Sequence, residues 1–509
     1  MVTPAPPGLV VAAPSSGSGK TTVTTGLMAA LAAGGAAVAP FKVGPDYIDP
    51  GYHALATGRP GRNLDPVLVG ERRIAPLYAH GAAGCDVGVV EGAMGLFDGR
   101  VDDADPAAAV VPPGSAAHVA GLLGLPVVLV VDVRGYSQTL SAVVRGLATH
   151  DPGTRIAGVI LNRVGSERHT AILTAACESV GVSVLGAVPR DGGLEVPSRH
   201  LGLVTVAEHA GPAEAAVAEM GRIVGEHVDL AALRALAARP APVEPWDPAA
   251  EIARAGGAHR TRADGAGAGD ETGGRGPDDE AGDRVTIALA GGPAFTFAYA
   301  EHAELLAAAG ARVVTIDPLV DPALPAGTAG LVLPGGFPEE HVAALAGNTG
   351  LMTRIADLVR AGMPVHAECA GLLYLGRTLA GRDGAEHALA GVLDLEGRFG
   401  PRLTLGYRDA VATADSVLFR AGERVVGHEF HRTTAAPTGG ERAPAAWAWR
   451  DRFGARVDEG IVSGSVHASY LHVHPAGHPE AVARFADAAR AWRASQGTRV
   501  KSGDGEVAG

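Results

Sequence analysis

Residues 9–33 read LVVAAPSSGSGKTTVTTGLMAALAA, and this stretch decides the fold of the first half of the chain. A short apolar run opens it and an alanine-rich run closes it, which predicts a buried strand followed by a helix. The loop between them has glycines that let backbone N–H groups approach a phosphate, a lysine for the β- and γ-phosphates, and a hydroxyl for Mg²⁺. Pro14 stands where such loops ordinarily have their first glycine. We assign ATP binding to Ser16, Gly17, Ser18, Gly19, Lys20, Thr21 and Thr22.

Two acidic segments follow, and each comes directly after a predicted strand. Residues 40–50 read PFKVGPDYIDP, and residues 87–99 read VGVVEGAMGLFDG. The carboxyl ends of parallel strands share one edge of the sheet, so we expect these segments to converge on the phosphate loop. Mg²⁺ takes a few carboxylate oxygens beside phosphate and water. We assign metal binding to Thr21, Glu91 and Asp46. We assign the positioning of a substrate carboxylate or phosphate to Lys42, Asp49 and Asp98.

Lysine is rare in this chain and therefore informative. Of the 42 basic residues only Lys20, Lys42 and Lys501 are lysines. Arginine is a wide planar fork and lysine a compact point charge, so a chain with this bias keeps lysine where the fork does not fit. Lys20 and Lys42 both fall in the segments described above, which favours their assignment to a phosphate site.

The second half carries a cysteine at a predicted turn between a strand and a helix. Residues 363–376 read MPVHAECAGLLYLG, the pattern of a nucleophile elbow, and we expect the helix N-terminus to lower the pKa of the Cys369 thiol. Upstream, residues 333–339 read LPGGFPE and can turn a backbone N–H toward an oxyanion. Downstream, residues 463–475 carry the histidines that a thiol nucleophile needs as a base. The three segments together indicate thiol-based nucleophilic catalysis.

Strand-like and helix-like runs alternate along both halves, which predicts α/β domains built on parallel sheets. Between the halves, the chain is rich in glycine, proline and charged residues and has almost no large apolar side chain, so we expect a flexible linker there. The boundaries that we predict are 1–238 for the first domain, 239–284 for the linker, 285–496 for the second domain and 497–509 for a disordered tail.

Composition and charge limit the classes of function. The 509 residues are 47% hydrophobic and 19% charged, which suits more than one folded core. The net charge of −13 argues against a nucleic-acid partner. The three cysteines are too few for a disulfide framework, and no stretch has the pattern of a signal peptide or a membrane span. We therefore expect a cytoplasmic protein that does not bind membranes.

These motifs together resemble the cobyrinic acid and hydrogenobyrinic acid a,c-diamide synthase family, the glutamine-hydrolysing amidases of the corrin ring in cobalamin biosynthesis. The likeness covers nearly the whole chain and misses only the linker and tail. The N-terminal half looks like dethiobiotin synthetase, a doubly wound P-loop fold, and the C-terminal half is similar to class I glutamine amidotransferases. The most specific parts are residues 16–22, 41–50, 91–98, 427–431 (GHEFH) and 470–472 (YLH).

The resemblance implies that Cys369 is the nucleophile of glutamine hydrolysis and His472 its general base, with backbone N–H groups at Gly336 and Ala370 for the oxyanion. It also implies ATP- and Mg²⁺-dependent amidation of the a and c acetate carboxylates of cobyrinate or hydrogenobyrinate, through an acyl phosphate that ammonia attacks. The implied partners are small molecules, namely the corrinoid carboxylate, ATP and L-glutamine, acting on a monomer or homodimer.

One position departs from the ordinary amidotransferase triad. Those enzymes usually carry a glutamate two residues after the histidine, where this chain has His474. What orients the His472 imidazole is therefore open, and His474 and His428 are the candidates. The sequence also leaves open whether the ring carries cobalt, which acetate reacts first, the ammonia path and the oligomeric state.

Three alternative functions stand beside this interpretation. Cobyric acid synthase typically has Gln and Met after Phe-Lys, where this chain has residues 43–46, VGPD. A nickel-sirohydrochlorin a,c-diamide synthase differs less and is harder to separate by motifs. A partitioning-type P-loop ATPase switch would carry an extra lysine at the position of Ser15 and would have no Cys/His half.

Overall fold

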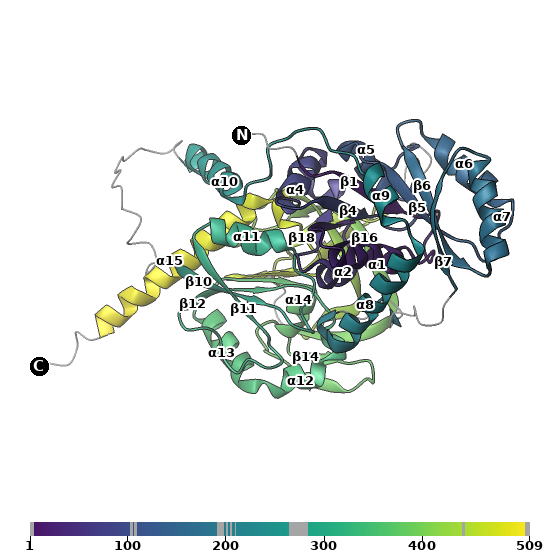
Figure 1. Ribbon diagram of the computed structural model, residues 1–509. Helices are drawn as coiled ribbons and strands as arrows, with labels where there is room; N and C mark the ends of the chain where they lie inside the picture. The colour runs from purple at the N-terminus through teal and green to yellow at the C-terminus, as the bar shows by residue number, and fades with distance from the viewer. Residues whose placement is uncertain are drawn as a thin grey trace, which may run out of the picture. The chain divides into compact units, whose positions relative to one another are not determined.

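A computed structural model describes residues 5–101, 105, 109–190, 198–199, 202–203, 206–208, 210–263, 284–439 and 443–503. The chain divides into two compact units, Met1–Trp246 and Asp247–Gly509. Each unit is an α/β structure with its own sheet and helices (Figure 1). The predicted fold class, a P-loop domain followed by an amidotransferase-like domain, is confirmed.

The first unit is built on a seven-stranded parallel sheet in the order β3-β2-β4-β1-β5-β6-β7. Its central strands are almost wholly buried because helices cover both faces, which explains why they are continuous apolar runs. The strands are β1 Gly8–Ala12, β2 Val38–Val43, β3 Arg62–Leu64, β4 Val87–Glu91, β5 Val127–Asp132, β6 Ile156–Val164 and β7 Val184–Pro189, with a small pair, β8 Ser198–Arg199 and β9 Gly202–Leu203.

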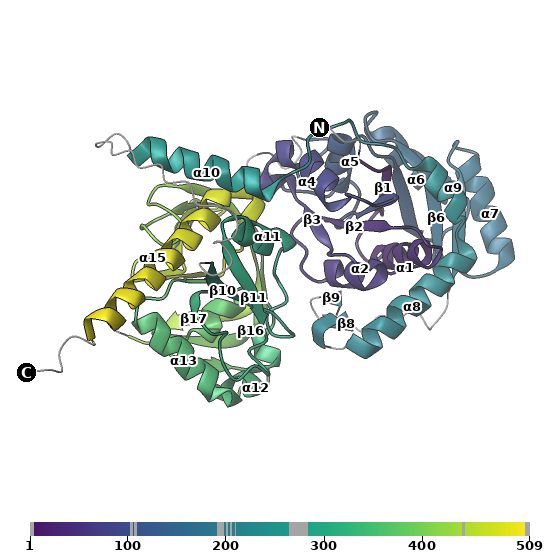
Figure 2. The ribbon, with the colours of Figure 1, turned by 60° about the vertical axis from the view of Figure 1, so that its left-hand side comes forward.

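Helices lie on both sides of this sheet; Figure 2 shows α1, α2 and α8 on one side and α4 and α5 on the other. They are α1 Lys20–Ala33, α2 Asp49–Thr57, α3 Pro66–Val69, α4 Ile74–Gly81, α5 Ala116–Leu123, α6 Leu140–His150, α7 Glu167–Glu178, α8 Ala210–His227 and α9 Leu230–Leu236, with the short 3-10 turns Glu71–Arg73 and Val206–Glu208. Strand β1 lies between β4 and β5, so the loop after it opens at the middle of the sheet's carboxyl edge.

The second unit has a six-stranded sheet in the order β11-β10-β12-β13-β21-β20, parallel except for the β20–β21 pair. A second sheet, which the sequence did not predict, contains a long antiparallel hairpin that carries the GHEFH motif. The strands are β10 Val285–Ala290, β11 Ala311–Ile316, β12 Thr328–Leu333, β13 Val365–Glu368, β14 Thr378–Ala380, β15 Glu386–Ala388, β16 Leu395–Ala412, β17 Arg424–Pro437, β18 Trp447–Arg450, β19 Arg456–Glu459, β20 Ile461–Ser463 and β21 Val466–Ser469.

The helices of this unit enclose a core in which alanine, leucine and aromatic side chains from β12, β13 and α14 meet. They are α10 Pro248–Ala263, α11 Ala300–Ala308, α12 Val342–Gly347, α13 Thr349–Arg360, α14 Ala370–Tyr374 and α15 Pro479–Gly503, with 3-10 turns at Pro338–Glu340 and Pro475–Gly477.

The segment expected to be a flexible linker is partly helical, which corrects that expectation. Helix α10 occupies Pro248–Ala263 and packs against α11 and α15. Trp246, which is 3% exposed, anchors the chain just before it, and Asp247 caps the helix by accepting a hydrogen bond from Ala249 N at 2.8 Å. The composition hid the helix because alanine-rich segments can pack on neighbouring helices without large apolar side chains. Residues 264–283 of the expected linker lie outside the described residues.

Part of the expected disordered tail, residues 497–503, is helical, which corrects that expectation. Helix α15 continues to Gly503, past residue 497 where the sequence lost its apolar periodicity. Residues 497–503 read GTRVKSG, which includes two glycines and has low intrinsic helix propensity, so the extension follows from propagation, in which each residue adds one backbone hydrogen bond to a helix that has already formed. Residues 504–509 lie outside the described residues.

The close approach of α1 and α8 generates a prediction about stability. A methyl group at Gly26 would lie 2.5 Å from Met220 O and 2.6 Å from a Val224 methyl of α8. Gly26→Ala should therefore force the helices apart and destabilise the protein by about 1–3 kcal/mol, measured as a lower midpoint of thermal unfolding. Gly121→Ala in α5 is the control, since a methyl there meets no atom within 4 Å. Equal midpoints for the two variants would contradict the packing argument.

Candidate active sites

The phosphate loop joins β1 to α1, and side chains near the carboxyl end of β6 hold its backbone. Gly17 and Gly19 both have φ of 78°, a conformation that favours glycine. Asn162 Nδ2 donates to Ser18 O at 2.9 Å, and Arg163 donates to Gly17 O at 3.1 Å. Sequence reasoning missed both of these side chains, although each follows a predicted strand at the same sheet edge. The loop's backbone is thus held in place before any ligand arrives.

Lys20, the first residue of α1, is 8% exposed and donates from Nζ to Met94 O at 2.7 Å. Burial, and then the charge on Lys42, lower the pKa of Lys20 to about 8. Asp98 accepts from Gly95 N at 2.8 Å and so shapes the turn that presents Met94. The substrate positioning that we expected of Asp98 stays a prediction.

The other predicted residues of this half are brought together in one cluster. Thr21 Oγ1 lies 2.7 Å from Glu91 Oε1 and 3.1 Å from Asp49 Oδ2. Lys42 Nζ contacts the same two oxygens, at 2.9 Å from Glu91 Oε1 and 2.5 Å from Asp49 Oδ2, and lies 3.5 Å from Asp46 Oδ2. Asp49, which we assigned from the sequence to substrate positioning and not to metal binding, therefore lies beside the threonine hydroxyl. Asp46 instead accepts from the backbone N–H of Asp49 at 3.0 Å.

The buried ionisable groups of this cluster shift one another's pKa values. Burial alone would raise the pKa of Glu91, but Lys42 and His53 hold it well below its usual range. Burial and then the Asp46 carboxylate raise the pKa of Asp49 to about 7. Burial alone would lower the pKa of Lys42, but the Asp49 and Glu91 carboxylates raise that pKa above its ordinary value. The cluster sets the Lys42 ammonium against the carboxyl groups of Glu91, Asp49 and Asp46, and Lys42 and Glu91 are both buried.

His53 belongs to this cluster, and sequence reasoning missed it. Its ring is fully buried on α2, and Nε2 lies 2.7 Å from Glu91 Oε2. His53 is four residues after Asp49, so the two side chains share one face of the helix. That spacing is the signal that could have identified it. Glu91 Oε2 thus contacts His53, while Oε1 contacts Thr21 and Lys42.

In the second unit, Cys369 stands between β13 and α14 with φ of 47° and ψ of −95°. Such a backbone is strained for a residue other than glycine and fits a nucleophile elbow. Its N–H donates to Ser469 O at 2.7 Å, which ties the elbow to the end of β21. The cysteine is 2% exposed. The strand end, the sharp turn and the helix therefore follow one another as the sequence predicted.

The backbone N–H groups of Gly336 and Ala370 both point at the Cys369 sulfur. The structure thus brings the two expected oxyanion donors to the cysteine. Burial and the nearby Glu339 carboxylate nevertheless raise the pKa of Cys369. This corrects the expectation that the helix N-terminus lowers it, because α14 is only five residues long and the site is dry. The thiol is protonated at rest and needs a base.

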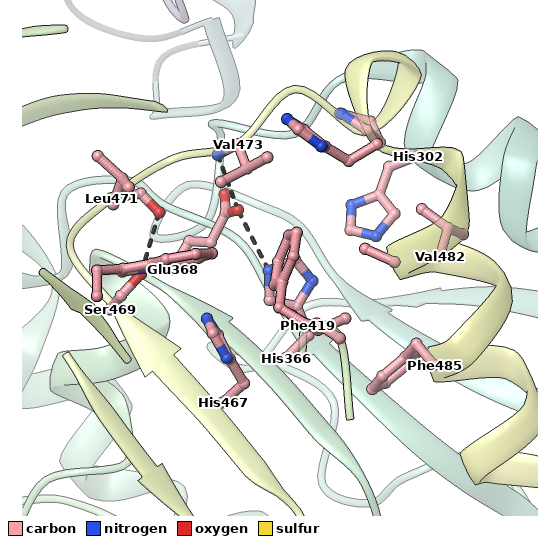
Figure 3. A pocket seen from close by; sticks show the side chains of 15 residues that line it. His302, His366, Glu368, Phe419, His467, Ser469, Leu471, Val473, Val482 and Phe485 are labelled. Atoms are coloured by element: carbon pink, nitrogen blue, oxygen red, sulfur yellow. Dashed lines mark hydrogen bonds and ion pairs between the residues drawn. The ribbon is translucent and has the colours of Figure 1, made fainter. Parts of the chain in front are cut away.

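His472 lies just beyond the end of β21, next to the elbow strand. Its backbone pairs in both directions with His428 of β17, at 2.9 Å each, so the GHEFH hairpin fixes this segment. The ring packs against Gly335, where a methyl group would collide with it. Nδ1 lies 3.3 Å from Oε2 of Glu368, a residue that sequence reasoning overlooked although it directly precedes the cysteine. Figure 3 shows Glu368 with its neighbours Val473 and His366.

Comparison with known proteins agrees with both units. Residues 9–204 match a family model described as CobQ/CobB/MinD/ParA nucleotide binding domain, and residues 286–479 match a CobB/CobQ-like glutamine amidotransferase domain. A protein of Mycobacterium tuberculosis named hydrogenobyrinate a,c-diamide synthase is 54% identical over 94% of this chain and 96% of its own length. One of Streptomyces coelicolor with the same name is 53% identical over 95% and 98%.

The chain belongs to the a,c-diamide synthase family. A more distant member, the cobyrinate a,c-diamide synthase of Gloeobacter violaceus, is 40% identical over 94% of this chain and 96% of its own length. As a member, this chain is a glutamine-hydrolysing amidoligase that carries out ATP-dependent amidation in cobalamin biosynthesis. Among the helices that the structure describes, none combines the length and apolar character that a membrane crossing requires.

The contact between His53 and Glu91 generates a prediction for this synthase. His53→Leu removes the donor and leaves Glu91 Oε2 buried without it, at a cost of about 1–3 kcal/mol. We expect a lower unfolding midpoint and an ATP-dependent amidation rate reduced about tenfold or more, with glutamine hydrolysis unchanged. His53→Gln keeps an N–H in reach and should retain most of the rate. Equal rates for the leucine and glutamine variants would contradict this role.

Proposed function

We propose that this synthase amidates the a and c acetate carboxylates of hydrogenobyrinate. The proposal rests on one observation: a single chain carries a lysine–carboxylate cluster beside a phosphate loop and a cysteine elbow whose preceding residue, Glu368, contacts His472. The relatives at 54% and 53% identity are named for hydrogenobyrinate, while one named for cobyrinate is 40% identical. The loop at residues 43–46, which differs from cobyric acid synthase, is held by Asn63 Nδ2 through Gly44 O at 2.8 Å and Asp46 O at 2.7 Å.

The residues of the first cluster suit an Mg²⁺ ion that ATP brings. Thr21 Oγ1 lies within hydrogen-bonding distance of both Glu91 Oε1 and Asp49 Oδ2, and oxygens are the donor type that Mg²⁺ prefers. Asp46, also proposed as a ligand, lies next to them. Among the described residues, no group of three or more acidic, histidine or cysteine side chains is placed so that it could hold a metal ion by itself. When bound, the ion would neutralise charge on the phosphates.

In this proposal the first unit activates the acid. An oxygen of the substrate carboxylate attacks the γ-phosphorus of ATP, the bond to ADP breaks, and an acyl phosphate results. Lys20 stabilises charge on the transferring group, and Lys42 holds the carboxylate or phosphate within reach. Ammonia then attacks the acyl carbon and inorganic phosphate leaves. The buried position of both lysines strengthens their electrostatic effect because the surroundings exclude water.

The second unit releases the ammonia. The Cys369 thiol gives its proton to His472 while the sulfur attacks the side-chain amide carbon of glutamine. The N–H groups of Gly336 and Ala370 bind the oxyanion, and the proton passes to the departing ammonia. Water then hydrolyses the thioester and glutamate leaves. The protonated resting thiol makes His472 necessary to this step.

The substrate is tested by incubating the full chain with ATP, Mg²⁺ and glutamine together with either hydrogenobyrinate or cobyrinate, and following the products by mass spectrometry. We expect hydrogenobyrinate to be amidated in two successive steps, each of which replaces one carboxyl oxygen with an amide nitrogen. The kcat/KM for hydrogenobyrinate should be at least about tenfold above that for cobyrinate. Preference for cobyrinate would overturn the substrate assignment. Amidation of neither would overturn the proposed reaction.

A reciprocal pair of variants tests the division of labour. Cys369→Ala should abolish glutamine-dependent amidation and leave ammonia-dependent amidation intact, since only the source of nitrogen is lost. Glu91→Gln should abolish both amidations and spare glutamate release, because the nucleotide site alone is changed. Each loss should reach at least about a hundredfold in rate, measured by product formation and glutamate release. Loss of ammonia-dependent turnover in Cys369→Ala would show that the two functions are not separated in this way.

A further inference from the structure

The glutamine site needs a group that holds the His472 imidazole, and the position that ordinarily supplies it carries His474. The structure shows that the His474 ring has other partners. Its Nδ1 accepts from Ala476 N at 3.3 Å, and its ring lies 4.0 Å from that of Tyr299. His428, the other candidate, meets His472 through its backbone, and its ring packs on Tyr407. Neither imidazole can provide the negative charge that a carboxylate supplies.

Glu368 meets His472 with one carboxylate oxygen while its other oxygen is anchored elsewhere. Oε1 lies 3.2 Å from His366 Nε2 and accepts from Val473 N, also at 3.2 Å (Figure 3). Oε2 lies 3.3 Å from His472 Nδ1. Because two donors fix the far oxygen, the near oxygen faces the imidazole in a defined orientation. The carboxylate can therefore select the His472 tautomer that has its proton on Nδ1.

The surroundings leave the charge of Glu368 available to His472. Among the described residues its ion pairs are with His366 and His472, and none is with lysine or arginine. Burial alone would raise the pKa of Glu368, but the neighbouring His366 and His472 hold it well below its usual range. Burial, and then the nearby His366, lower the pKa values of His302 and His467 to about 3, so these neighbouring rings stay neutral.

The space beside Glu368 excludes bulk water. A cavity of about 20 Å³ lies there, with room for about one water molecule, and Phe419 and Phe485 help to line it. Figure 3 shows Phe419 and Phe485 among the side chains that line this cavity together with Glu368. In so dry a place a carboxylate interacts with a neighbouring imidazolium more strongly than it would in water.

We propose that Glu368 is the positioning residue that completes the glutamine-hydrolysing site by holding His472, in place of the glutamate that ordinarily follows the histidine. This inference rests on the proposed roles of Cys369 and His472. The Nδ1–H of His472 donates to Glu368, which leaves the Nε2 lone pair to accept the thiol proton as the S–C bond forms. The resulting imidazolium is stabilised by Glu368, which stays ionised while the proton moves on to the ammonia as the C–N bond breaks.

The test compares carboxylate-to-amide variants in the full chain. Glu368→Gln should lower kcat for glutamate release by about 10²–10⁴-fold, because the amide can offer an N–H to Nδ1 and favour the wrong tautomer. The KM for glutamine should change little, since Glu368 acts through His472. Replacing the anion also removes stabilisation of the imidazolium, so the acidic limb of the kcat/KM profile should move to lower pH. Ammonia-dependent amidation should be unchanged, which shows that the variant is folded.

Two further variants separate positioning from mere structure. Glu368→Asp keeps the charge and should recover at least about tenfold of the rate lost in Glu368→Gln. Glu459→Gln is the matched control, because Glu459 accepts from Tyr470 N at 2.6 Å in the chain segment that leads to His472. It should leave both the rate and the pH profile close to those of the unaltered protein.

Several outcomes would overturn the inference. They are unchanged kcat in Glu368→Gln, equal losses in Glu368→Gln and Glu459→Gln, or a lost rate with an unmoved pH profile. If Glu368→Gln also loses ammonia-dependent turnover, Glu368→Asp decides. A rate of glutamate release in Glu368→Asp that is no higher than in Glu368→Gln then rejects the inference. Glutamate release that survives Cys369→Ala would instead reject the proposed function on which the inference rests.

Discussion

Both units depend on a buried carboxylate at the last residue of a parallel strand. Glu91 ends β4 and Glu368 ends β13, and each is less than 10% exposed. An ionised carboxylate taken out of water costs several kcal/mol unless partners satisfy it. The residues that surround each strand end must therefore supply hydrogen-bond or ionic partners for the carboxylate. The helices and neighbouring strands that carry those residues must be placed so that the partners reach it.

The partners differ between the two units, and the chemistry differs with them. Glu91 is paired with Lys42, whose charge burial does not remove, so the cluster is suited to anionic phosphate and carboxylate groups. Among the described residues, Glu368 forms ion pairs with His366 and His472 and with no lysine or arginine, so in the proposed reaction its charge acts on a ring that gains and loses a proton during each turnover. A permanent cation would have neutralised Glu368 and weakened its effect on His472.

The sequence predicted what local chemistry encodes. The phosphate loop and the cysteine elbow each occupy one continuous stretch, in which a strand, glycines and a helix follow one another, and both were found. Glu368 stands inside the cysteine stretch and His53 lies three residues after the acidic segment at 40–50, and both were still missed, because their roles come from contacts with residues that are far apart in the chain. Helix α10 was missed for another reason: alanine packs well but gives a weak periodic signal. The β16–β17 hairpin pairs with the His472 segment through backbone bonds that no side-chain pattern records.

The state of Cys369 between turnovers has a consequence for the lifetime of the protein. Oxidants such as peroxide react with exposed thiolates, and the ladder from sulfenic to sulfonic acid begins with that form. Cys369 is 2% exposed and burial raises the pKa of its thiol, so in the proposed reaction the sulfur stays protonated until a substrate and His472 act on it together. The same burial that makes a base necessary thus protects the nucleophile from oxidative damage while the site is idle.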